Sequence, residues 1–152
     1  TTVTIGAGIL NANDNNTTTI TETNVYHIGA VAVNGDLTIG AGVGAGEYGH
    51  DKSDDHQEVD DWQATELGLS YVSGDFTVTA SFMDSSSLDA ASASTPSGST
   101  DELSKAAVSV DYAVASGVTT TLGYLSQTAK DEGTKKDTSS GSSWYIGTNL
   151  SF

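Results

Sequence analysis

The chain has no cysteine and no arginine, and it contains a single proline, Pro96. The lack of cysteine excludes disulfides and thiolate metal sites. No apolar run approaches the roughly 18 residues that indicate a transmembrane helix, and a hydrophobic content of 36% is low for a dense soluble core. These absences do not exclude a membrane β-barrel, because barrel strands carry only a weak alternating signal.

Basic residues are also scarce. Twenty acidic residues stand against five lysines, which gives a formal net charge of −15. A surface of this charge repels nucleic acid, so a nucleic-acid partner is not expected. The acidic residues are interpreted either as solvated loops that keep a β-rich protein soluble or as a surface that attracts cations.

Glycine (17 residues), threonine, serine and alanine are abundant, and small and β-branched residues suit pleated strands. The last nine residues, Trp144–Phe152, illustrate the pattern. Every second residue from Trp144 onward forms a largely apolar face with an aromatic at each end, and most residues between are small and polar. Alternation over about 9–11 residues is typical of a tilted membrane strand.

The same period of two recurs along the chain and predicts eight strands, joined by connections that alternate between long and short. The short turns are Asn34-Gly35, Ser73-Gly74 and Ala115–Gly117, and Asn-Gly is a strong hairpin signal. Long polar connections are expected at 11–24, 46–61, 84–102 and 128–143. The expected strands are Thr2–Leu10, Val25–Val33, Leu37–Ala45, Trp62–Val72, Phe76–Met83, Leu103–Val114, Val118–Gln127 and Trp144–Phe152.

This arrangement predicts an all-β fold: an antiparallel up-and-down transmembrane β-barrel in which residues 1–152 form one barrel domain or barrel segment. In bacterial outer-membrane barrels the short turns face the periplasm and the long loops face outward. Both termini are therefore expected on the periplasmic side.

Aromatic residues are predicted to form two rows that flank an aliphatic band, like the girdles of a membrane barrel. A soluble sandwich would tend to place its large aromatics mid-strand, in its core. The row near the short turns comprises Tyr71, Phe76, Tyr112 and Phe152. The row near the long loops comprises Tyr26, Tyr48, Trp62, Phe82, Trp144 and Tyr145.

The second face of the strands is dominated by Gly, Ala, Ser and Thr, with Glu66, Lys105 and Asp111 as its most evident charged residues. A closed eight-stranded barrel fills its interior with side chains, and these residues are too small to do so. A water-filled lumen of roughly 16 strands fits them better. The three charged residues are therefore candidate pore-lining residues; the alternative is polar lining with no role in selectivity.

The glycine-rich strands, the Asn-Gly and Ser-Gly-Asp turns, the acidic loops and the final Trp-Tyr-Ile-Gly-Thr-Asn-Leu-Ser-Phe (144–152) resemble the C-terminal half of an α-proteobacterial general porin of the Rhodobacter type. The resemblance implies a 16-stranded, homotrimeric diffusion pore in contact with outer-membrane lipid and lipopolysaccharide, without a cofactor. Family pores set an arginine-bearing wall opposite an acidic loop of their N-terminal half. This chain is about half as long and has no arginine, so neither element maps onto it.

The densest acidic cluster lies in the second long connection. Its six carboxylates are candidate oxygen ligands for Ca²⁺, although their spacing is not that of an EF-hand loop; the alternative is a solvated external loop. His50, Ser53 and Asp54 are neighbours in sequence, but adjacency is not triad geometry, so no catalytic residues and no enzyme activity are expected. The candidate Ca²⁺ ligands are Asp51, Asp54, Asp55, Glu58, Asp60 and Asp61.

The sequence therefore predicts an outer-membrane porin that forms a water-filled channel for passive diffusion of small hydrophilic solutes and ions. The excess of acidic residues predicts a mild preference for cations. Two alternatives stay open. One is a small outer-membrane barrel without a channel, acting as a surface, binding or structural protein. The other is a soluble, acidic, β-rich protein of the secreted or adhesin type.

Overall fold

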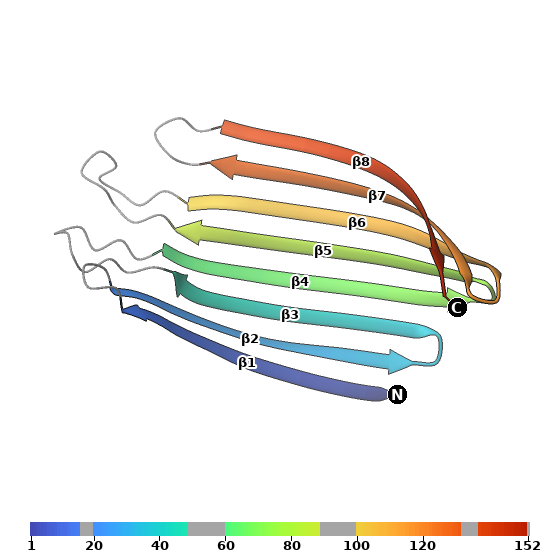
Figure 1. Cartoon of the computed structure of the whole chain (residues 1–152), viewed down its shortest axis with the longest axis horizontal. Coiled ribbons are helices and arrows are strands. Elements are labelled where there is room, and N and C mark those ends of the chain that lie inside the picture. The colour runs from blue at the N-terminus through green and yellow to red at the C-terminus, as the bar shows by residue number, and fades with distance from the viewer. Residues whose placement is uncertain (16–19, 49–59, 89–99, 132–136, 152) are drawn as a thin grey trace.

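The computed structural model describes residues 1–15, 20–48, 60–88, 100–131 and 137–151. The secondary structure of these residues is a single antiparallel sheet of eight strands, which lie side by side in chain order (Figure 1). No helix in this part of the chain is long and apolar enough to cross a membrane. The strands are β1 (Thr2–Asn15), β2 (Ile20–Asn34), β3 (Leu37–Tyr48), β4 (Asp60–Ser73), β5 (Phe76–Leu88), β6 (Thr100–Ala115), β7 (Val118–Asp131) and β8 (Asp137–Leu150).

The sheet is open. Each strand pairs with its neighbour in the chain, but the described residues of β1 and β8, the two outer strands, do not contact each other. The prediction of an all-β, antiparallel, up-and-down architecture with eight strands is therefore confirmed, whereas the sheet formed by the described residues is not closed into a barrel.

The strands are longer than predicted at the ends remote from the short turns. Segments 11–15 and 20–24, expected in a connection, belong to β1 and β2, and the other three connections shrink in the same way to 49–59, 89–99 and 132–136. Backbone pairing needs no apolar side chain, and polar pairs support it here: the Asn11 side-chain amide donates to Asn24 Oδ1 at 2.5 Å. A prediction based on apolar alternation ends a strand too early for this reason.

The three short turns depend on glycines with positive φ: Gly35 (60°), Gly74 (59°) and Gly117 (75°). Because Asn34 pairs with Leu37 and Ser73 with Phe76, the central residues of the first two turns are Gly35-Asp36 and Gly74-Asp75, one residue later than predicted. A positive φ at the first central residue alone matches a type II′ turn, which glycine favours.

Each short turn is also tied to the next hairpin along the sheet. The carbonyl of Asp36 accepts a hydrogen bond from the Val72 amide at 2.9 Å, and the carbonyl of Asp75 accepts one from Ala113 at 2.8 Å. The carbonyl of Gly117 accepts the amide of Ser151 at 2.8 Å. These bonds fix the stagger of successive hairpins, so the turns set the register of the whole sheet.

The three short turns and both ends of the described chain lie at one end of the sheet, which we call the turn end (Figure 1). The strand ends at Asn15, Tyr48, Leu88 and Asp131 lie at the other, which we call the loop end. The predicted segregation of short turns and termini from the other connections is thus present in the sheet.

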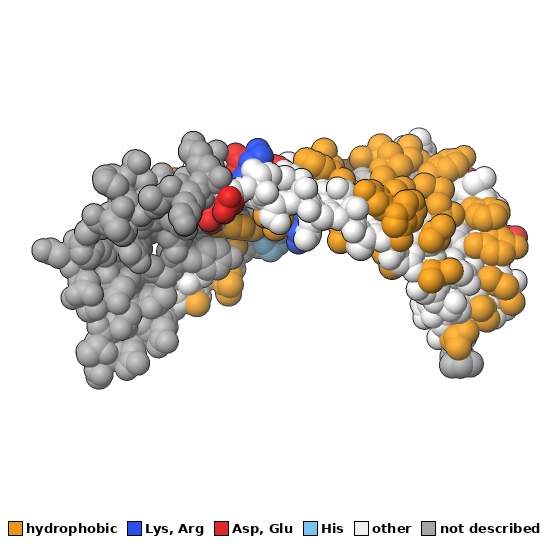
Figure 2. Space-filling view, turned by 90° about the horizontal axis from the view of Figure 1, so that it is seen from above, with side chains coloured by type: hydrophobic (Ala, Val, Ile, Leu, Met, Phe, Trp, Pro, Cys, Tyr) orange, Lys and Arg blue, Asp and Glu red, His pale blue; other side chains and the backbone are white. Residues whose placement is uncertain are grey.

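The described residues include no buried hydrophobic side chain. Ile9, Ile146 and Trp144 are 79%, 77% and 72% exposed. The accessible surface is 10384 Å², whereas a compact monomer of 15.5 kDa has about 7,200 Å². In space-filling view the molecule is an arch, with hydrophobic side chains crowded away from the segments drawn in grey (Figure 2). The described residues therefore form a single sheet without a hydrophobic core.

A positive φ costs a residue with a Cβ about 1–2 kcal/mol, so Gly74→Ala should lower the free energy of unfolding by about that amount. Gly68→Ala is the matched control, because Gly68 has no positive φ and an added Cβ there meets nothing within 4 Å. Urea unfolding from detergent micelles, followed by tryptophan fluorescence, measures both. Equal effects of the two substitutions would contradict the assigned turn.

Candidate pore wall

Residues that pair directly across antiparallel strands lie on the same face of a sheet, so the register assigns every described strand residue to one of two faces. One row of pairs runs across all eight strands through apolar residues only: Val3, Ala32, Ile39, Leu69, Ala80, Val108, Tyr124 and Trp144. We call this side the apolar face. It contains most of the residues predicted to face outward, including Tyr26 of β2.

The opposite side, which we call the small-residue face, has rows of a different composition. Half of one such row is glycine, and its only side chains beyond glycine come from β4 to β7. This row consists of Gly6, Gly29, Gly42, Glu66, Met83, Lys105, Gln127 and Gly141.

Two of the three candidate pore-lining residues share that row. Met83 pairs with both Glu66 and Lys105, so these charges lie two strands, about 10 Å, apart at the same level. Neither forms an ion pair with another described residue. Asp111 lies on the same face six positions nearer the turn end, where it accepts a hydrogen bond from the Thr121 hydroxyl. The small-residue face thus carries Glu66 and Lys105 at one level, and Asp111 on the same face nearer the turn end.

A hollow of about 980 Å³ lies over the first five strands on this face. Its lining includes Gly6, Gly42, Glu66 and Met83. Glycines lie at the base of this hollow because three neighbouring strands contribute them. In β3 every second residue from Gly40 to Gly46 is glycine. This hollow therefore lies where several neighbouring strands have glycine and so no side chain.

Several larger rings of the small-residue face lie against cross-strand glycines, a contact that the sequence pattern did not predict. A Cβ added at Gly8 would collide with the His27 imidazole, and one at Gly123 would collide with the Tyr145 ring. A Cβ at Gly44 would come within 3.2 Å of the Trp62 indole. Covering glycine with an aromatic ring protects the strand backbone and holds the ring close to the wall.

In the predicted outer aromatic row, Trp62 and Tyr145 do not share the apolar face. Trp62 pairs with Gly46, and Tyr145 pairs with Gly123, which places both on the small-residue face. Nearness to a strand end does not decide which face a residue occupies, whereas the period of two does. The signal was in the sequence: Trp62 is four residues from Glu66 and therefore shares its side.

The predicted girdle residues Tyr71, Phe76, Tyr112 and Trp144 all lie on the apolar face, and Phe152 is outside the described residues. The rings of Phe76 and Tyr112 stack with centroids 4.7 Å apart, near the turn end. Tyr124 and Trp144 form a tilted pair, also at 4.7 Å, nearer the loop end. On β6 and β7 the aliphatic pair Val110 and Leu122 lies between the rows of these two aromatic pairs, as a band between girdles requires.

The apolar band crosses the strands obliquely. It spans Val3–Ile9 on β1 and Trp144–Leu150 on β8, yet Val3 and Trp144 occupy the same row of pairs. The band is thus displaced by six residues over seven strand-to-strand steps. At about 3.3 Å per residue and about 4.8 Å per strand, this corresponds to an angle of about 30°. Strands of membrane barrels tilt by roughly 35–45° to the barrel axis.

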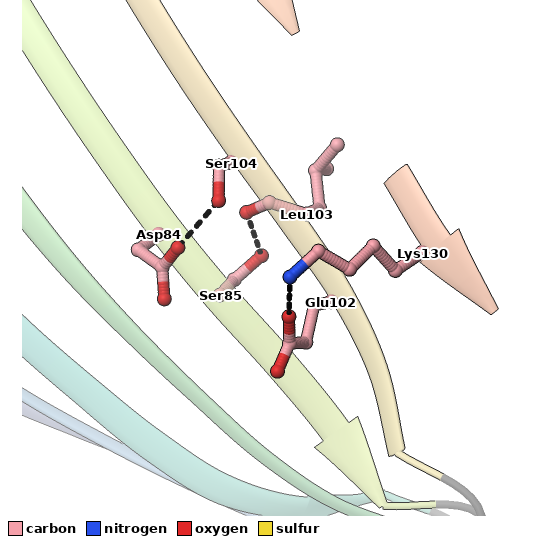
Figure 3. Close-up of polar contacts among 6 residues, drawn as sticks. All are labelled: Asp84, Ser85, Glu102, Leu103, Ser104 and Lys130. Carbon is pink, nitrogen blue, oxygen red and sulfur yellow. Dashed lines mark hydrogen bonds and ion pairs between the residues drawn. The ribbon is translucent and has the colours of Figure 1, made fainter. Parts of the chain in front are cut away.

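Above the band, toward the loop end, the apolar face becomes polar (Figure 3). Ser104 Oγ donates to Asp84 Oδ2 at 2.6 Å, and Lys130 Nζ lies 2.7 Å from Glu102 Oε2. These pairs are largely exposed, so each contributes little to stability. These polar pairs mark a boundary, because the apolar stretch of β5 and β6 ends where they begin.

The candidate Ca²⁺ ligands Asp51, Asp54, Asp55 and Glu58 lie outside the described residues. Asp60 and Asp61 begin β4. Within the described ranges no three histidine or acidic side chains gather into a metal site. Calcium binding therefore stays a prediction.

No protein-family model, curated protein or solved structure matches the chain. The resemblance to general porins therefore stays a prediction, and the chemistry of the sheet's two faces is what supports a function.

Gly123→Ala should push the Tyr145 ring off the wall, at a cost of about 1 kcal/mol in unfolding free energy, because the ring end can swing away. The loss should vanish in a Tyr145→Ala background. Gly147→Ala, where an added Cβ meets nothing within 4 Å, is the control. A double-mutant cycle by urea unfolding measures the coupling; additive losses would refute the ring–glycine contact.

Proposed function

We propose that the chain forms part of the wall of an outer-membrane porin, a water-filled channel for passive diffusion of small hydrophilic solutes and ions. The main observation that supports this proposal is the oblique apolar band on one face of the sheet, together with the many small residues on the other face.

The apolar face supports a membrane location because nothing within the described chain covers it. On β5 and β6 the band spans six residue steps, from Phe76 to Phe82 and from Ala106 to Tyr112, about 20 Å along the strand. With its aromatic borders this approaches the apolar height of roughly 25 Å found in outer-membrane barrels. Exposed apolar surface on this scale needs a lipid or protein environment.

The small-residue face supports a lumen rather than a packed interior. Glycine, serine and threonine fill little volume, and the rings of His27 and Tyr145 lie over glycines of the wall instead of projecting from it. Water can solvate such a surface, and a barrel of about 16 strands is wide enough to hold a continuous channel.

In this proposal the turn end faces the periplasm and the loop end faces outward, in contact with lipopolysaccharide. Diffusion through a wet pore needs neither a catalytic residue nor a cofactor, so no enzyme activity is proposed. The trimer implied by the porin resemblance is proposed as the oligomer of complete barrels. The net charge of −15 favours cations at the pore mouths.

Two neighbouring residues of β6 test which face meets lipid. Arginine on a lipid-facing barrel surface near the bilayer centre costs about 2–4 kcal/mol. Val110→Arg, on the apolar face, should therefore lower the free energy of unfolding from liposomes by about that amount, while Ser109→Arg, on the small-residue face, should change it little. A larger loss for Ser109→Arg would reverse the proposed orientation.

Conductance tests the pore itself. In planar bilayers the reversal potential under a KCl gradient should indicate mild cation preference. Glu66→Gln should reduce that preference and Lys105→Gln should increase it, because each removes one charge from the lumen. Asp84→Asn, on the apolar face, is the matched control and should leave selectivity unchanged. Absence of current, or anion preference of the unmodified channel, would contradict the proposal.

A further inference from the structure

The two outer strands present unpaired backbone groups along their free edges. Within the described residues, β1 and β8 each have a partner on one side only. Their apolar stretches, Val3–Ile9 and Trp144–Leu150, belong to the band proposed to meet lipid. Unpaired N–H and C=O groups cost several kcal/mol each in hydrocarbon, so neither edge can stay open there.

Both edges also lack the features that keep edge strands from pairing. Proteins protect exposed edges with lysine, proline, bulges or short strands. Neither β1 nor β8 contains lysine or proline, both are 14 residues long, and the one register irregularity lies elsewhere, between β6 and β7. Edges this long and regular are suited to pairing.

The free edge of β1 is complementary to the free edge of β8. An even number of strands makes β1 and β8 run in opposite directions, so β1 of one chain can pair with β8 of another in antiparallel orientation. A register that pairs Val3 with Leu150 also pairs Ile9 with Trp144 and Gly6 with Gly147. It keeps apolar residues on the apolar face and glycines on the small-residue face, and it aligns the band on both sides of the seam.

We propose that a second copy of this chain closes the barrel: β8 of each copy pairs with β1 of the other, which joins two eight-stranded sheets into one 16-stranded ring. The arrangement is a two-fold dimer with two identical seams, and it leaves no open edge. This inference rests on the proposed porin function and adds to it the partner that completes the wall.

The absence of cysteine allows a clean cross-linking test. In the proposed register Ala7 of one copy lies opposite Ile146 of the other, on the apolar face. Ala7→Cys and Ile146→Cys chains are refolded together in detergent and treated with a short bifunctional thiol reagent. A product of twice the 15.5 kDa chain mass should form in the mixture and not with either variant alone.

A displaced pair provides the matched control. Ser142→Cys lies on the same face as Ile146→Cys but four residues away, so its yield with Ala7→Cys should be several-fold lower. Equal yields would overturn the register. A chain carrying both Ala7→Cys and Ile146→Cys separates the two ways of closing. An internally cross-linked chain of monomer mass would mean that β1 and β8 of one chain pair in a small barrel, which overturns the proposal.

The unmodified chain gives a second readout that does not depend on any variant. Light scattering in detergent should report two chains per particle for a single barrel, or six where three complete barrels stay associated, and a particle of one chain would overturn closure by a second copy. Failure of closure and failure of the channel remain distinguishable. Cross-linked dimers that carry no current would refute the porin function and not the seam, whereas current without cross-linking would refute the seam alone.

Discussion

Backbone pairing between neighbouring strands holds this fold together, because the described residues bury no side-chain core. In a soluble sheet protein, strand pairing and hydrophobic burial act together, and burial supplies most of the favourable free energy. Here the ladder is complete from β1 to β8, while the apolar side chains remain on the surface. In the proposed barrel, lipid covers the apolar face and a partner pairs with the outer strands, which supplies the burial that the described residues lack.

The strict period of two lets the same strands serve two environments. Each residue step reverses the face, so in the proposed wall Val108 and Val110 meet lipid while Ser109 between them meets water. Glycine on the small-residue face keeps the wall thin, and rings such as Tyr145 over Gly123 compensate for part of the lost side-chain packing. In the proposed barrel, a wide lumen would follow from the same alternation that makes the other face apolar.

Much of the fold could be predicted because it depends on local signals. Alternation identified eight strands and the residues of each face, and the glycines at 35, 74 and 117 marked the short turns. The strand ends could not be predicted, because polar pairs such as Asn11 with Asn24 extend the ladder where the apolar signal stops. The candidate pore wall could be predicted only in part from the sequence. Composition suggested Glu66, Lys105 and Asp111, but only the cross-strand register shows that Glu66 and Lys105 share one level with Met83 between them.

The claim that one face meets lipid and the other water can be measured most directly by cysteine scanning of β6 from Ala106 to Ala113 in liposomes, one variant at a time in this cysteine-free chain. A charged, water-soluble thiol reagent should label Ala107, Ser109 and Asp111 as cysteines, while Ala106, Val108 and Val110 as cysteines should be reached only by a lipid-soluble reagent. Reactivity that alternates with a period of two is the predicted result. Uniform labelling of every position by the charged reagent, or protection of both faces from it, would contradict a wall between lipid and water.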